Sequence, residues 1–203
     1  MLCLWHTANS ADGLNLKALA HAFSQFDENL GTRAVPSGAD GLFHKKKHRD
    51  SIIHGQIVTR WSKEFPCDGI IAVNDKAASN DVLKAAYKAA SGKKTFVWTL
   101  DAFEKKSQKV LDSDTQYFLI TKNPIDMCKI LVDQGFKCGI DTVIVGPCND
   151  REGAVKLGNN QSITQEEADA FEKIAQAGYK IKFALLPDVS IGTWDDFKSK
   201  FGY

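Results

Sequence analysis

The chain has 203 residues, 43% hydrophobic and 25% charged, with a formal net charge of +1. This length suits one domain with a sizeable core, and the composition excludes a disordered chain. The near-neutral charge excludes a general attraction to nucleic acid or acidic membranes, and no apolar run approaches the roughly 18–20 residues that span a bilayer. The first residues lack the features of a secretory signal, so we expect a cytoplasmic protein.

The N-terminal region does not follow the pattern of the rest of the chain. Residues 14–26 have the apolar spacing of a helix, and residues 31–42 have the composition of a linker. The segment HKKKHR (44–49) is rich in lysine, which is unsuited to a strand buried on both faces. We therefore expect residues 1–47 to be an extension without an apolar first strand, and residues 48–203 to form the domain.

The remainder of the chain alternates short apolar runs with helical patterns. We expect strands at 69–73, 95–100, 116–121, 141–146 and 180–186, and helices at 78–91, 101–111, 125–134 and 165–178, with a last short helix within 193–203. Three helix starts have local signals: Asp101 with Glu104, Asn123 followed by Pro124, and Thr164 with Glu167.

Alternating strands and helices with buried strands predict an α/β fold of three layers, α/β/α, with a mainly parallel sheet. In such folds, ligands bind beyond the carboxyl ends of the strands. The loops expected at this edge are 74–75, 99–101, 121–123 and 146–147, together with the loop that carries His54.

Cysteines and histidines give little indication of a metal site. The five cysteines are widely spaced and form no C-x-x-C pair, so we expect reduced thiols. They are Cys3, Cys67, Cys128, Cys138 and Cys148. His44 and His48 are four residues apart, but the three lysines between them would repel a cation. The same lysines lack the aromatic or glycine interleaving of a nucleic-acid site, and a solvated basic segment is the default.

The segment RDSIIHGQIVTRW (49–61) places His54 directly before Gly55 and a predicted helix over 56–64. A phosphorylated imidazole carries about two negative charges, which backbone N–H groups and a helix start stabilise. Gly55 would let the backbone approach the phosphate, Asp50 could fix the imidazole tautomer, and Ser51 could donate to a phosphate oxygen. The residues alone allow either a phosphoryl acceptor or a hydrogen-bonded structural histidine.

The stretch DSIIHGQIVTRW resembles the active-site loop of the IIB components of the mannose/fructose/sorbose family of the bacterial phosphoenolpyruvate-dependent sugar phosphotransferase system. That loop typically reads D-x-R-L-I-H-G-Q-V, with a tryptophan a few residues on. The likeness continues through IIAVNDKAASND (70–81), FLITKNPIDMCKILVDQG (118–135) and the segment from Thr142 to Asp188.

This resemblance implies a cytoplasmic phosphocarrier, peripheral to a membrane transporter, that requires no metal or organic cofactor. His54 would accept a phosphoryl group from a IIA partner and pass it to a sugar that crosses the membrane through IIC and IID partners. By the same match, the phosphate-binding loop would comprise Asp50, Ser51, Gly55 and Gln56, with Arg49, Arg60, Asp75 and Lys122 at the docking surface or the edge of the site.

Two departures from the family pattern leave alternatives open. Ser51 stands where the family has an arginine, for which Arg49 or Arg60 could substitute. The family begins with an apolar first strand, and residues 1–47 could instead be a remnant of a fused domain, a divergent extension or a stretch outside the native reading frame.

Two rival functions also remain open at this point. The first is a degenerate docking or regulatory module that carries no phosphate. The second is a hydrolase or phosphatase that uses Asp75 or Cys148 at a strand end, although neither residue lies in a recognisable nucleophile motif.

Overall fold

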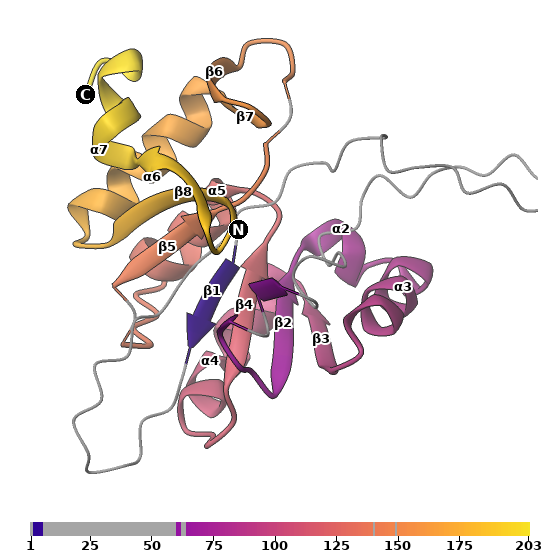
Figure 1. Ribbon diagram of the computed structural model, residues 1–203. Coiled ribbons are helices and arrows are strands. Elements are labelled where there is room, and N and C mark those ends of the chain that lie inside the picture. Colours follow the sequence, from indigo (N-terminus) through magenta and orange to yellow (C-terminus); the bar gives the residue numbers. More distant parts are fainter. Residues whose placement is uncertain (1, 6–59, 62–63, 140, 149) are drawn as a thin grey trace, which may run out of the picture.

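The computed structural model describes residues 2–5, 60–61, 64–139, 141–148 and 150–203. Its centre is a seven-stranded sheet of order β3-β2-β4-β1-β5-β8-β9, and a separate two-stranded sheet pairs β6 with β7 (Figure 1). None of the helices in these ranges is long and apolar enough to cross a membrane.

The strands are β1 (Leu2–Trp5), β2 (Gly69–Val73), β3 (Lys94–Trp98), β4 (Tyr117–Thr121), β5 (Thr142–Val145), β6 (Val155–Gly158), β7 (Gln161–Ile163), β8 (Lys180–Leu186) and β9 (Val189–Thr193). The helices are α2 (Asp75–Ala78), α3 (Asp81–Ser91), α4 (Leu100–Leu111), α5 (Pro124–Cys128), the π-helical turn η2 (Lys129–Asp133), α6 (Gln165–Gln176), α7 (Trp194–Phe197) and the 3₁₀ turn η3 (Lys198–Phe201).

Successive residues of each strand point to opposite faces of the sheet. Helices cover both faces, so each strand contributes side chains to two cores. On one face, buried residues of α4, α5, α6 and α7 form a core with Ile71 of β2 and Leu119 of β4. On the other face, α2, α3 and Trp61 pack with Ile70 and Phe118. β2 is parallel to β3 and β4, and β5 is parallel to β8. The predicted three-layer α/β fold with a mainly parallel sheet is confirmed.

The strand at the centre of the sheet corrects the expectation that the N-terminal region contains no apolar strand. β1, with the sequence LCLW, is antiparallel to β4, with Cys3 opposite Leu119, and antiparallel to β5, with Leu2 opposite Ile144. Four consecutive apolar residues suit a strand with a neighbour on each side. β1 thereby connects the β2-β3-β4 half of the sheet to the β5-β8-β9 half, while the boundary at residue 47 stays a prediction.

Local helix signals were confirmed at two starts and wrong at a third. Asn123 caps α5 with Pro124 in its first turn, and Thr164 forms a capping box with Glu167. α4, however, begins at Leu100 with Thr99 as its cap, so the predicted box that starts at Asp101 is wrong.

The structure also corrects the extent of other predicted elements. The helix expected over 78–91 is divided, because α2 ends at Ala78 and Asn80 caps α3. The hairpin β6–β7, between the predicted strand at 141–146 and Thr164, and the strand β9 were not predicted.

Candidate functional site

The predicted loops after β2, β3, β4 and β5 lie at one edge of the sheet, whereas the loop that carries His54 lies outside the described residues. In register, Val73 of β2 pairs with Trp98 of β3 and with Thr121 of β4. Because β1 is antiparallel to both β4 and β5, those two strands run in the same direction, and the carboxyl ends of β2, β3, β4, β5 and β8 share an edge. Lys122 lies in the loop after β4 and Asp75 is the first residue of α2, both at the edge where the sequence placed them.

Asp75 links the loop after β2 to the start of α4. Its Oδ1 accepts a hydrogen bond from the backbone N of Leu100 at 2.8 Å. The preceding residue, Asn74, receives a bond from Ala77 N to its Oδ1 at 2.9 Å and donates its own N to Trp98 O at 3.0 Å. One carboxylate oxygen of Asp75 is thus engaged in holding two loops together, which supports a positional role rather than that of a nucleophile.

The loop after β4 is ordered by a local hydrogen-bond network around Asn123. The hydroxyl group of the buried Thr121 donates a hydrogen bond to Asn123 O, with an Oγ1–O distance of 2.7 Å. Asn123 Oδ1 accepts from Asp126 N at 2.7 Å, and its Nδ2 donates to Asp126 Oδ2 at 3.0 Å. Lys122 is held between these residues, so the network fixes the backbone from which its side chain extends.

Asp126 is a titratable group at this edge that the sequence analysis did not select. Partial burial raises its pKa above the ordinary 3.8, and the negative charge of Asp75 acts in the same direction, while Asn123 and Lys129 oppose it. The charge of Asp75, at the start of α2, therefore acts on the carboxyl group of Asp126 in α5. The available sequence signal was the acidic residue three positions after the Asn123 cap.

Arg60 and Trp61 are the described residues closest in sequence to His54. Trp61 is fully buried, and Phe65 N donates to Trp61 O at 2.8 Å, as in a helical turn. Arg60 lies at the surface, where its Nη2 is 3.1 Å from Asp188 Oδ1 in the turn between β8 and β9. Asp188 could not be identified as a partner of Arg60 from the sequence, because 128 positions separate the two residues.

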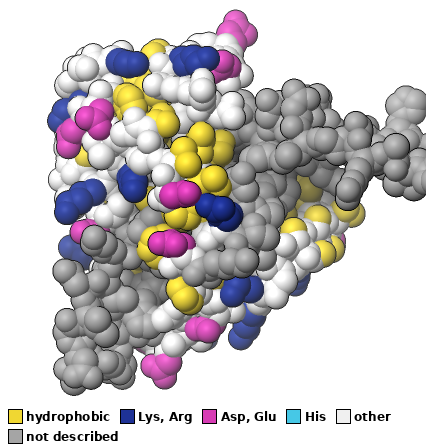
Figure 2. All heavy atoms as spheres, viewed as in Figure 1, with side chains coloured by type: hydrophobic (Ala, Val, Ile, Leu, Met, Phe, Trp, Pro, Cys, Tyr) yellow, Lys and Arg dark blue, Asp and Glu magenta, His cyan; other side chains and the backbone are white. Residues whose placement is uncertain are grey.

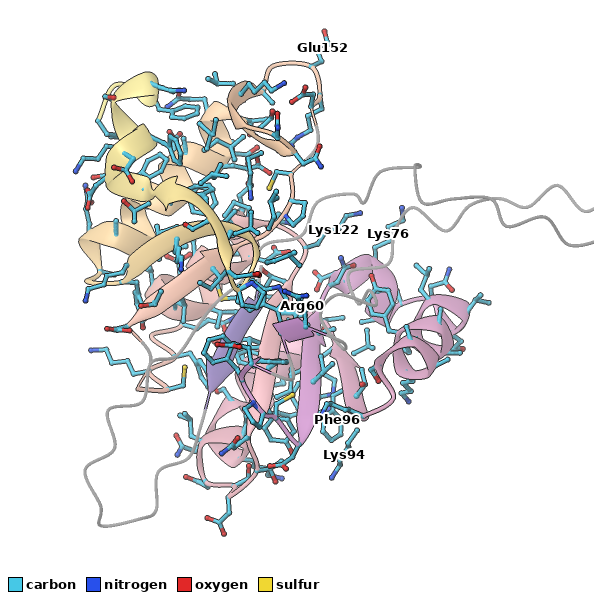
Figure 3. All side chains as sticks on the ribbon, in the orientation of Figure 1. Arg60, Lys76, Lys94, Phe96, Lys122 and Glu152 are labelled. Atoms are coloured by element: carbon cyan, nitrogen blue, oxygen red, sulfur yellow. The ribbon has the colours of Figure 1, made fainter. Side chains whose placement is uncertain are left out.

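Basic side chains are present along this edge of the sheet. Figure 3 shows Arg60, Lys76 and Lys122 on this side, with Lys94 and Phe96 toward the opposite end of the strands. On the face drawn in Figure 2, acidic and basic side chains are interspersed rather than separated into large patches of one sign. The basic side chains at this edge likewise stand among acidic ones, namely Asp75, Asp126 and Asp188, in agreement with the small net charge of the chain.

The described cysteines are unsuited to nucleophilic chemistry. Cys67, Cys128, Cys138 and Cys148 are buried and form no disulfide among the described residues. Burial raises the pKa of Cys67 to about 11 and also raises the pKa of Cys128. Cys148 Sγ donates to Gly146 O at 3.4 Å. Within the described ranges, no group of three histidine, cysteine or acidic residues is arranged to hold a metal ion.

The remaining predicted site residues lie outside the described part of the chain, and their roles stay predictions. They are His54 and the loop residues Arg49, Asp50, Ser51, Gly55 and Gln56.

Comparison with known proteins identifies similar chains. The family model "PTS system sorbose subfamily IIB component" matches residues 48–202. The fructose-specific EIIB component of Bacillus subtilis (strain 168) is 29% identical over 140 residues, which cover 68% of this chain and 84% of that protein. The mannose-specific EIIAB component of Escherichia coli (strain K12) is 30% identical over 135 residues, 66% of this chain but 41% of that longer protein.

Solved structures give the same result. The IIBSor domain of the sorbose permease from Klebsiella pneumoniae superposes with a TM-score of 0.64 and 27% identity, covering 74% of this chain and 91% of that domain. ManxB from Thermoanaerobacter tengcongensis gives a TM-score of 0.64 and 26% identity over the same shares of the two chains.

Proposed function

Because the chain belongs to the sorbose subfamily of phosphotransferase-system IIB components, we propose that it is a protein-histidine phosphotransferase that carries a phosphoryl group on His54. The donor would be the phosphohistidine of a IIA partner, and the acceptor a sugar that enters through membrane IIC and IID partners. The protein would act in the cytoplasm, bound to that transporter. The observation that carries the proposal is the family match over residues 48–202, which includes the whole histidine loop.

The proposed transfer needs a nucleophile and a cradle for the phosphoryl group. The neutral imidazole of His54 would form a new N–P bond while the N–P bond of the donor breaks, and the electron pair returns to the donor imidazole. Backbone N–H groups around Gly55 and Gln56, with the Ser51 hydroxyl, would hold the phosphoryl oxygens, and Asp50 would orient the imidazole. Catalysis would then rest on positioning and electrostatics.

The described residues would support docking of the partner. Arg60 and Lys122 supply positive charge at the carboxyl edge, where a phosphorylated donor brings negative charge. Such charges mainly accelerate encounter, and their effect is screened by salt. Asp75, through its bond from Leu100 N, would maintain the loop geometry at the edge of the site without contacting phosphate.

The second candidate function is a docking or regulatory module that carries no phosphate. The observation in its favour is Ser51, which stands where the family pattern has an arginine. Loss of that positive charge would weaken binding of the phosphoryl group unless Arg49 or Arg60 replaces it. The partner surface would be preserved in either case.

Phosphoryl labelling separates the two functions. The protein is incubated with phosphoenolpyruvate, the general phosphotransferase proteins and a matching IIA, and acid-labile phosphate is measured by mass spectrometry. A parallel sample receives phosphoramidate, a small donor that requires no partner. We expect one phosphoryl group, lost in His54→Ala and retained in the control His44→Ala.

The outcomes of this experiment are distinct. Label that survives His54→Ala would identify another acceptor and refute the assignment. If neither donor labels the unaltered protein, the chain is not a phosphocarrier, and retained binding to IIA would then establish the docking module.

A further inference from the structure

Arg60 already has an anionic partner within the protein. Its Nη2 lies 3.1 Å from Asp188 Oδ1, and the two side chains are 52% and 67% exposed. Arg60 follows His54 by six positions, whereas Asp188 belongs to the turn between β8 and β9 at the carboxyl edge of the sheet. The contact therefore joins Arg60, at the end of the stretch 49–61, to a part of the fold that is distant in the sequence.

The exposure of this ion pair allows Arg60 to exchange Asp188 for another anion. An ion pair between solvent-exposed side chains contributes little net stability, so an anion that approaches Arg60 can replace Asp188 at low cost. The guanidinium group can bind a phosphoryl group or a carboxylate with two parallel hydrogen bonds, a stronger arrangement than the single contact to Asp188. The neighbouring Trp61 is fully buried, so the backbone can stay in place while the Arg60 side chain changes partner.

We propose that Asp188 is an internal counter-ion that competes with the anionic phosphoryl donor for Arg60. The inference rests on the proposed function, because it gives Arg60 a role in docking of the donor. Asp188 acts through Arg60 as a positioning residue: it holds the guanidinium at the edge of the site in the free protein, lowers affinity for the donor and favours release after transfer.

The test compares the kinetics of phosphoryl transfer from phosphorylated IIA to Asp188→Asn, Arg60→Gln and the double variant. Asp188→Asn should lower KM about two- to five-fold, as expected for loss of an exposed ion pair, with a smaller change in kcat. Arg60→Gln should raise KM, and in that background Asp188→Asn should have no further effect. Asp188→Glu retains the charge and should leave KM near that of the unaltered protein.

A matched control separates this local effect from a change in net charge. Asp141 pairs with Lys180 at 3.7 Å, with side-chain exposures of 57% and 79%, at the amino ends of β5 and β8. Asp141→Asn adds the same charge at the opposite edge of the sheet and should leave KM unchanged. Binding assays with phosphorylated and unphosphorylated IIA then identify the competing anion, which is the phosphoryl group if only the former gains affinity and acidic side chains if both do.

Failure of this inference is distinguishable from failure of the proposed function. If the unaltered protein takes no phosphate on His54, the proposed function is wrong. If it is phosphorylated but Asp188→Asn leaves KM unchanged or raises it, only the counter-ion role is overturned. An equal fall of KM in Asp141→Asn, or a persistent effect of Asp188→Asn in the Arg60→Gln background, overturns it as well.

Discussion

Replacement of Trp61 by alanine tests how the chain is held on the sheet at residues 60–61. Trp61 is 0% exposed and stacks on Phe65 with ring centroids 6.1 Å apart. A buried tryptophan removes about 150–250 Å² from water, and at about 25 cal/mol per Å² this contributes about 4–6 kcal/mol. Aromatic-to-alanine substitutions in cores cost about 3–5 kcal/mol. We expect Trp61→Ala to lower the free energy of unfolding by about 3–5 kcal/mol, measured by urea denaturation.

Trp194 provides a control of the same residue type on the other face of the sheet. It is 2% exposed, packs near Phe171 and donates Nε1 to Glu172 Oε2 at 2.7 Å. Trp194→Ala should destabilise the fold to a similar extent, but at a temperature where both variants are folded, only Trp61→Ala should lose phosphoryl transfer to His54. Equal transfer rates in the two folded variants would refute the reasoning, as would a loss of stability in Trp61→Ala below about 1 kcal/mol.

Three other substitutions test the packing of β2, the cap of α5 and the titration of Asp126. Gly69→Ala places a Cβ 2.8 Å from both Lys94 O and Tyr117 Cε1, so we expect a loss of about 1–3 kcal/mol in urea denaturation, and an unchanged stability would contradict this packing. Asn123→Ala removes the cap of α5 and should cost about 0.5–2 kcal/mol in the same assay. The pKa of Asp126 is raised above 3.8, so its carboxyl binds a proton more tightly in the folded state. Its contribution to stability is full below 3.8 and is lost as pH rises through the raised pKa, and stability curves of Asp126→Asn across this window should lack that slope.

The sheet and its helices could be predicted largely because their signals are local. The runs at 69–73 and 117–121 are buried on both faces and read as continuous apolar segments in the sequence. Asn123 and Thr164 cap helices by accepting hydrogen bonds from residues three positions later, so the residues that decide these boundaries lie close together in the sequence. Such features need no knowledge of the rest of the chain.

The errors arose where several local choices compete or where the partner is distant. Thr99 and Asp101 both have side chains that can cap a helix, and the backbone that leaves β3 selects Thr99. β1 takes its place through pairing with β4 and β5, which no local pattern reveals.

The features of the candidate site also fall into those that a sequence rule could locate and those that it could not. Asp75 and Lys122 could be placed at the edge of the sheet by the rule for carboxyl ends of parallel strands. The influence of Asp75 on the pKa of Asp126 and the pairing of Arg60 with Asp188 arise from tertiary structure, and no sequence spacing indicates them.

Arg60 and Trp61 are adjacent residues whose contacts with the rest of the fold differ greatly in strength. Burial of Trp61 contributes several kcal/mol, whereas an exposed pair such as Arg60 with Asp188 contributes about 0–1 kcal/mol. The proposed phosphocarrier, which would have to bind a donor and release it, would need a rigid backbone and a charged side chain that can exchange partners. Burial of Trp61 fixes the backbone at residues 60–61, and the weak ion pair leaves the Arg60 charge available, so changes at Trp61 should appear in folding and changes at Asp188 in KM.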